Sequence, residues 1–186
     1  TLSNSIIFSG SKGIGKATLA FYLINKIFED LSSVNKNKNH SNFIYNFTHP
    51  NIRYIEKEFD EKTNKYRSSI SIERIRNLEN FLYQSSLDNL PKFIIIDAAD
   101  DLNKNSGNSL LKILEEPKKE TYFILIAHQL SSILPTIRSR CIKFNIEKPN
   151  FENFTKIINL NDNIIDSENI NFLFNLSNSS PGLAID

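Results

Sequence analysis

A glycine-rich segment near the start of the chain has the residues and the spacing of a phosphate-binding loop. It reads Gly10-Ser-Lys-Gly-Ile-Gly-Lys16. Glycines at these positions let backbone N–H groups close on phosphate oxygens, and the lysine reaches the outer phosphates. The next residue of such a loop is normally Ser or Thr, whose hydroxyl holds Mg²⁺. Here it is Ala17, and Thr18 would point from the following helical position. The sequence therefore predicts a site that holds a phosphate group and binds Mg²⁺ poorly.

A second acidic motif lacks its catalytic partner. The hydrophobic run Phe93–Ile96 leads into Asp97, and Ala98 stands where many ATPases carry a glutamate that activates water. A site of this kind can hold a phosphate and can hardly attack one. The candidate ligand is ATP or ADP, with weak Mg²⁺ binding at best. The candidate nucleotide-binding residues are Gly10, Gly13, Ile14, Gly15, Lys16, Ala17, Thr18 and Asp97.

Strand and helix patterns alternate through most of the chain. Ile6–Phe8 indicates a buried strand, and Lys16–Phe28 reads as a helix. Ser71 can cap a helix that ends near Ser85. The apolar residues of the first helix have helical spacing: Leu19, Ala20, Leu23, Ile24 and Ile27. Further strands are expected at 51–56, 93–96, 122–127 and 141–146, and a further helix at 106–116. The alternation predicts an α/β fold, a P-loop domain whose parallel sheet is flanked by helices and whose ligand crevice lies at the strand C-termini.

The remaining segments divide the chain. Residues 32–42 are rich in Asn, Ser and Lys and indicate a solvated loop, and residues 58–68 indicate a hairpin tip. After Pro149 the pattern is helical only, over 151–159, over 166–176 and after a Ser/Pro/Gly turn at 177–182. We therefore expect two domains, 1–148 with the P-loop and 149–186 as a small all-helical lid domain.

Composition excludes several classes of protein. The net charge of +1 and the 40% hydrophobic content indicate a globular chain that no whole-molecule field draws to DNA or to anionic membranes. The longest apolar runs are too short to span a membrane, and no leader precedes Ser5, so a cytoplasmic location is expected. Cys141 cannot form an internal disulfide or build a zinc site alone. The absence of Met and the start at Thr1 predict a piece of a longer protein.

Four motifs in this order resemble those of the AAA+ clamp-loader subunits, and most closely those of the delta prime subunits of bacterial DNA polymerase III. They are the phosphate-binding loop, the Ile-Ile-Asp-Ala-Ala-Asp segment, Asn108-Ser-Leu-Leu-Lys-Ile-Leu-Glu-Glu-Pro117 and Leu134-Pro-Thr-Ile-Arg-Ser-Arg-Cys141. The last two are the specific ones, because phosphate-binding loops are widespread. The resemblance covers residues 6–184.

The resemblance implies a place in a hetero-pentamer with the gamma/tau and delta subunits, within the DNA polymerase III holoenzyme, a nucleotidyltransferase. The ring opens a sliding clamp and places it on primer–template DNA, which it contacts only as a complex. Each ATP lies between neighbouring subunits, so Arg140 would act in trans as an arginine finger on a neighbour's nucleotide. The other interpretation of Arg140 is an ion pair with a local carboxylate. With Ala17 and Ala98, the expected role is a stator with little or no ATPase of its own.

The chain also departs from the pattern of the family. Many delta prime subunits carry a four-cysteine zinc module where residues 34–42 stand here, so no zinc is expected. The polar sensor position falls at Ala127-His128, and we interpret His128 as a surface-loop histidine, with a phosphate contact as the alternative. Ser179–Ala184 resembles the start of the lid helix, but the sensing arginine of active relatives is not evident, and the collar-forming domain is not in this chain.

Three other functions are weighed against the stator. An active AAA+ ATPase, such as a gamma/tau-like motor subunit, would explain why Lys16 is kept. A P-loop kinase of small nucleotides would leave the two specific segments unexplained. Direct DNA binding would need a basic patch, but the lysines concerned lie in solvated loops and not on one helical face. They are Lys36, Lys38, Lys62 and Lys65.

Overall fold

The structure is a computed structural model that describes residues 4–32, 40–45, 47–160 and 167–185. Its centre is a five-stranded sheet in the order β2-β5-β6-β1-β7, in which every neighbouring pair is parallel. The strands are β1 (Ser5–Ser9), β2 (Ile52–Ile55), β5 (Lys92–Asp97), β6 (Thr121–Ala127) and β7 (Ile142–Asn145). Parallel neighbours require crossover connections, which helices supply for most of them. The predicted α/β fold with a parallel sheet flanked by helices is confirmed.

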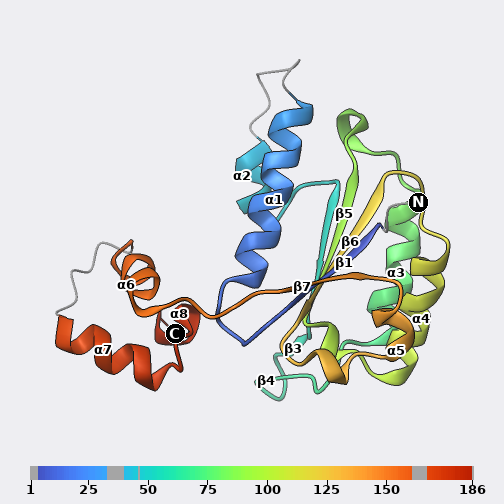
Figure 1. The fold of residues 1–186 in the computed structure, drawn as a ribbon. Coiled ribbons are helices and arrows are strands. Elements are labelled where there is room, and N and C mark those ends of the chain that lie inside the picture. Colours follow the sequence, from blue (N-terminus) through green and yellow to red (C-terminus); the bar gives the residue numbers. More distant parts are fainter. Residues whose placement is uncertain (1–3, 33–39, 46, 161–166, 186) are drawn as a thin grey trace.

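Helices cover both faces of the sheet (Figure 1). One face carries α1 (Lys16–Leu31) and α2 (His40–Tyr45). The other carries α3 (Ile72–Tyr83), α4 (Lys104–Glu115) and α5 (Pro135–Arg138). The central strands are therefore buried on both sides, which is why β5 and β6 read as continuous apolar runs and not as alternating ones.

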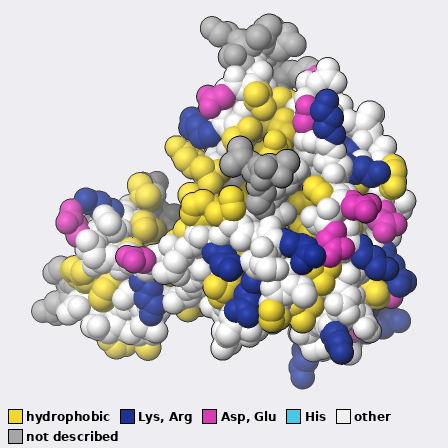
Figure 2. All heavy atoms as spheres, turned by 45° about the vertical axis from the view of Figure 1, so that its right-hand side comes forward, with side chains coloured by type: hydrophobic (Ala, Val, Ile, Leu, Met, Phe, Trp, Pro, Cys, Tyr) yellow, Lys and Arg dark blue, Asp and Glu magenta, His cyan; other side chains and the backbone are white. Residues whose placement is uncertain are grey.

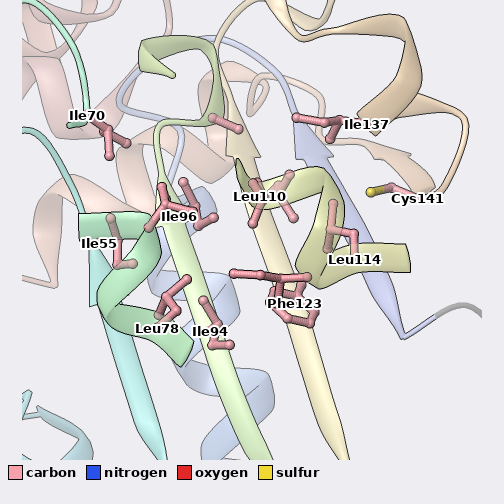
Figure 3. Packing of buried hydrophobic residues seen from close by; sticks show 14 of the residues in the cluster. Ile55, Ile70, Leu78, Ile94, Ile96, Leu110, Leu114, Phe123, Ile137 and Cys141 are labelled. Atoms are coloured by element: carbon pink, nitrogen blue, oxygen red, sulfur yellow. The ribbon is translucent and has the colours of Figure 1, made fainter. Parts of the chain in front are cut away.

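The larger hydrophobic cluster lies between the sheet and helices α3 and α4 (Figure 3). Ile94 and Ile96 of β5 and Phe123 of β6 face Leu78 of α3 and Leu110 of α4, and all five are at most 2% exposed. Burying each such side chain stabilises the fold by about 1.5–3 kcal/mol. This packing fixes β5 and β6 relative to each other, and both strands lead into the candidate site.

Helix α1 forms as predicted, but it buries only part of the stripe that its apolar spacing marks. Leu23 and Ile27 belong to that stripe but are 36% and 39% exposed. The buried residues are Lys16, Ala20, Ile24, Asn25 and Phe28. Asn25 is buried because its amide donates to Glu29 Oε1 at 2.7 Å and accepts from the Ser41 hydroxyl of α2 at 3.0 Å. These polar contacts satisfy a side chain that the apolar pattern placed outside the core.

The two helices on the other face begin at side-chain caps. Ser71 caps α3 as predicted, and Asn103 caps α4 by accepting from the N–H groups of Asn105 and Ser106 at 3.0 Å. Helix α4 therefore begins two residues earlier than expected. The C-terminus of α3 is closed by Lys92, the first residue of β5, whose ammonium donates to carbonyl oxygens of this helix end. Its acceptors are Phe81, Leu82 and Gln84.

The two segments predicted to be irregular have different outcomes. Residues 33–39 of the predicted solvated loop lie outside the described residues, but 40–42 belong to α2, so the loop prediction was wrong there. Residues 58–68 form the predicted hairpin, with β3 (Phe59–Asp60) antiparallel to β4 (Lys65–Tyr66). Phe59 and Tyr66 pack edge to face across it, with ring centroids 5.2 Å apart.

The last part of the chain is helical and has its own small core. Helices α6 (Phe151–Asn159), α7 (Ser167–Leu176) and α8 (Pro181–Ile185) bury Phe154, Ile158 and Ile170 together. They form a lobe beside the main body (Figure 2). The predicted boundary between residues 148 and 149 falls in the stretch that joins β7 to α6. None of the described helices is long and apolar enough to cross a membrane.

Candidate nucleotide site

The candidate site lies at the C-terminal edge of the sheet, where β1, β5 and β6 end side by side. β1 leads into the phosphate-binding loop, β5 ends at Asp97, and β6 leads into His128. Parallel strands bring their C-termini to the same edge, which makes this edge the usual ligand site of an α/β sheet. A pocket at this edge brings together the predicted binding residues except Gly10. They are Gly13, Ile14, Gly15, Lys16, Ala17, Thr18 and Asp97.

The loop has a backbone that only glycine adopts easily. Gly13 has φ +78° and Gly15 has φ +88°, and Gly15 directly precedes α1. No described side chain caps the first turn of α1. Its N–H groups and the helix dipole are therefore arranged as in sites that bind phosphate at a helix N-terminus. The loop and the start of α1 fit a phosphate group.

Lys16 lies beneath this loop and is only 3% exposed. Its ammonium donates to the carbonyl oxygens of Gly10 at 2.8 Å and Ser11 at 2.6 Å. Burial lowers the pKa of Lys16, and the nearby carboxylates of Asp97 and Asp100 partly offset this shift. Gly10 does not line the pocket, but its carbonyl positions the lysine. Lys16 thus both closes the loop and places a positive charge at the pocket.

Asp97 accepts a hydrogen bond that the sequence motif did not predict. The Tyr54 hydroxyl on β2 donates to Asp97 Oδ2 at 2.8 Å. Burial, and then the adjacent Asp97, raise the pKa of Tyr54 strongly, so its hydroxyl stays protonated. Mg²⁺ in such a site needs oxygen ligands in near-ideal octahedral geometry. Ala17 supplies none, and Tyr54 already engages one Asp97 oxygen, so the residues present fit the metal less well than those of a loop that carries Ser or Thr at this position.

Hydrogen bonds to Asp100 link the segment after β5 to the segment after β6, where His128 lies. The Asp100 carboxylate accepts from the backbone N–H groups of His128 at 3.0 Å and Gln129 at 3.2 Å. The interpretation of His128 as a surface-loop residue was wrong, because it lines the pocket and its Nδ1 is buried with no partner among the described residues. Burial and then the charge of Lys16 lower the pKa of His128, and the neighbouring Lys12 acts in the same direction.

Residues of α6 and α8, two helices of the expected lid domain, and Leu160 at the end of α6 line the other side of the pocket. The N–H of Gly182 in α8 donates to the carbonyl oxygen of Gly13 at 2.8 Å. A Cβ on Gly182 would lie 2.9 Å from that same oxygen, so this approach requires glycine. Apolar side chains from α1 and the lid complete the wall, and together they would suit the base of a nucleotide. They are Leu19, Tyr22, Ile157, Leu160, Pro181 and Ile185.

Arg140 does not line this pocket. It follows α5, and its guanidinium donates to Glu115 Oε1 of α4 at 2.6 Å and to the carbonyl oxygen of Thr136 at 3.0 Å. The side chains of Arg140 and Glu115 are 39% and 48% exposed. The local ion pair considered from the sequence is therefore present.

A statistical model of the family described as "DNA polymerase III, delta subunit" matches residues 1–150. The curated relatives include proteins named DNA polymerase III subunit delta'. The one from Pseudomonas aeruginosa is 38% identical over 96 residues, which cover 52% of this chain and 27% of the relative. The one from Buchnera aphidicola subsp. Baizongia pistaciae is 33% identical over 171 residues, covering 86% of this chain and 49% of the relative. The chain belongs to the DNA polymerase III delta prime family.

The chain matches at most about half the length of these two delta prime relatives. The crystal structure of a DNA polymerase III gamma subunit-related protein from Thermotoga maritima matches 94% of this chain and 48% of its own. It does so with a TM-score of 0.61 at 20% identity, which shows a shared fold. The structures of RuvB from Thermotoga maritima match in the same way, with a TM-score of 0.53 for one variant at 17% identity.

The two segments most specific to the delta prime resemblance meet in space. Glu115 lies in the segment 108–117 and Arg140 in the segment 134–141, and their ion pair joins them. Sequence reasoning considered a local ion pair for Arg140 but did not identify Glu115 as its partner, and it missed Tyr54. Nothing in the spacing of single residues signals either contact, because both depend on which elements lie side by side.

Proposed function

We propose that this chain belongs to a stator subunit of a clamp loader, one that helps load the sliding clamp onto primed DNA and has little or no ATPase of its own. It would assemble in the cytoplasm with gamma/tau and delta subunits in a hetero-pentamer, contact the sliding clamp, and meet primer–template DNA only within that complex. Its own pocket would hold ATP or ADP without turnover. Two features of the chain together carry this proposal: a pocket that lacks a metal ligand and a catalytic base, and an exposed Arg140.

The pocket supports the first half of the proposal. It offers backbone N–H groups and Lys16 to a phosphate, but Ala17 and Ala98 supply neither a metal ligand nor a base. Deprotonating the attacking water is a step that a positioned base accelerates, typically 10²–10⁴-fold. Nucleotide held here would therefore be hydrolysed slowly.

Arg140 supports the second half. Its partner Glu115 is about half exposed, and exposed ion pairs contribute only about 0.2–1 kcal/mol. A phosphate carried by a neighbouring subunit can displace such a pair, because a bidentate guanidinium–phosphate contact is stronger. The guanidinium is held by its local contacts and is still reachable from outside the chain.

The charge distribution supports DNA binding by the assembled complex and not by this chain alone. The net charge is +1, and acidic and basic side chains are intermingled on the face that Figure 2 shows. Of the lysines considered for a basic patch, Lys62 and Lys65 lie at the β3–β4 hairpin beside Asp60 and Glu61. Lys36 and Lys38 lie outside the described residues. A lone chain of this kind is expected to bind DNA weakly.

The test is Arg140→Ala in the full-length subunit, assembled with its partner subunits. An arginine finger contributes about 10³-fold or more to phosphoryl transfer. We expect ATP hydrolysis at the neighbouring site to fall by about that factor in single-turnover measurements, with the complex still assembled by size-exclusion chromatography. Lys143→Ala, on the exposed edge strand β7, is the matched control and should leave the rate unchanged.

Unchanged hydrolysis in the Arg140→Ala complex would rule out the trans role. The competing function, an active motor subunit, is tested separately with the purified protein alone. Several turnovers per second without its partners would favour the motor and contradict the stator.

A further inference from the structure

Tyr54 and Asp97 are brought together by the register of the sheet. Tyr54 on β2 pairs with Ile95 on β5, and side chains two residues apart on a strand share a face. Asp97 therefore lies diagonally across from Tyr54, on the face that α1 covers. The resulting hydrogen bond from the Tyr54 hydroxyl to Asp97 Oδ2 is 2.8 Å long.

The ring of Tyr54 is held in place by two phenylalanines. The centroids of Phe21, on α1, and Phe47, after α2, each lie 5.6 Å from the Tyr54 ring centroid. Phe21 and Phe47 also pack against each other at 5.0 Å. Aromatic groups packed in this way have restricted rotamers. The hydroxyl is thus aimed at Asp97 by contacts from two separate segments.

The hydroxyl of Tyr54 also weakens the repulsion between the Asp97 carboxylate and a bound phosphate. A free carboxylate facing phosphate oxygens repels them unless a metal ion lies between. A hydrogen bond to the carboxylate disperses part of its charge and uses one of its oxygens. Since Ala17 cannot supply the other usual ligand, the local chemistry favours a phosphate without its metal.

We propose that the hydrogen bond from Tyr54 to Asp97 makes this loop a metal-independent site for a nucleoside di- or triphosphate. Backbone N–H groups and Lys16 would hold the phosphates without a metal ion. This deepens the proposed function and rests on it only in assigning nucleotide to the pocket. Tyr54 is a positioning residue in this scheme, since it acts on the phosphate through Asp97. Removing its hydroxyl should therefore restore a response to Mg²⁺ wherever a second ligand is available.

The experiment uses four forms of the full-length protein: wild type, Ala17→Ser, Tyr54→Phe and the double variant. ATP binding is measured by calorimetry, once with Mg²⁺ and once with EDTA. We expect the affinity of the wild type to be the same in both buffers. The double variant should bind ATP at least about tenfold more tightly with Mg²⁺, the lower end of the changes caused by groups that orient a metal ligand. Ala17→Ser alone should gain much less.

Tyr83→Phe is the matched control, because Tyr83 is exposed at the end of α3 and does not line the pocket. It should leave both affinities unchanged. A wild type that needs Mg²⁺, an Ala17→Ser variant with the full Mg²⁺ response, a double variant with none, or a wild type that binds no ATP would each overturn the proposal. The Arg140→Ala experiment measures ATP hydrolysis at the neighbouring subunit, whereas this experiment measures ATP binding to the chain itself. A negative result in one can therefore be told apart from a negative result in the other.

Discussion

Lys16 is 3% exposed beneath the phosphate-binding loop, whereas the side chain of Arg140 is 39% exposed beyond α5. Both cations are already paired, but with different partners. Lys16 donates to two backbone carbonyls of its own loop, whereas Arg140 forms an exposed ion pair with Glu115 and also donates to the carbonyl oxygen of Thr136. A buried cation with backbone partners cannot leave without exposing unpaired groups. An exposed ion pair exchanges partners at little cost. The comparison separates a cation that maintains its own site from one that is reachable from outside the chain.

Replacing Lys16 should damage the chain's own pocket and spare the neighbour's reaction. In Lys16→Met the carbonyls of Gly10 and Ser11 lose their donor and a bound phosphate loses its positive partner. Charged hydrogen bonds contribute about 1.5–3 kcal/mol, so ATP affinity should fall by about 10- to 100-fold by calorimetry. The single-turnover hydrolysis of the assembled complex should stay within about twofold, since Arg140 is untouched.

If Lys16→Met lowers the neighbour's hydrolysis as strongly as Arg140→Ala does, the two cations are not independent. Thermal unfolding of the variant, followed by circular dichroism, verifies that it is folded before either measurement is interpreted.

Breaking the Glu115 pair should have a smaller effect. Glu115→Gln keeps the size of the side chain and a weaker acceptor for Arg140. Because an exposed pair contributes about 0.2–1 kcal/mol, hydrolysis at the neighbouring site should change by about fivefold or less. The measurement is the same single-turnover assay, with Glu116→Gln as the adjacent control. A loss as large as that of Arg140→Ala would mean that Glu115 itself takes part in the reaction.

The smallest expected effect concerns His128 and pH. The pKa of His128 is lowered in the folded chain, so between that value and the unfolded value the unfolded chain binds more protons. Stability contributed by neutral His128 is therefore present above the unfolded pKa of about 6.5 and is lost as pH falls. His128→Gln should flatten the decrease in unfolding free energy from pH 7.5 to pH 5.5, measured by urea denaturation. An unchanged slope would contradict the shift.

The central strands and the phosphate-binding loop could be predicted because their signals are local. β5 is a continuous apolar run, and glycines followed by Lys16 specify the loop backbone. Helix α1 was predicted less well because spacing shows only that apolar residues share a stripe. It does not show that Asn25 would be satisfied by Glu29 and Ser41 and take an inward position.

The contacts that define the two sites could not be predicted in the same way. Tyr54 reaches Asp97 only because β2 pairs with β5 in one particular register, and Arg140 reaches Glu115 only because α5 packs beside α4. His128 was misplaced because a residue after a strand can face solvent or a pocket, and the neighbouring elements, here the segment after β5 with Asp100, decide which. These outcomes depend on tertiary arrangement, which residue types alone do not encode.

The contact between Gly182 and Gly13 ties the lid to the loop with no side chain in between. The hydrogen bond joins the two backbones directly, and the side chains of Leu183 and Ser180 pack beside Gly13. A shift of Gly13 must be followed by α8 or the hydrogen bond breaks. The orientation of α8 is therefore coupled directly to the position of the loop backbone at Gly13.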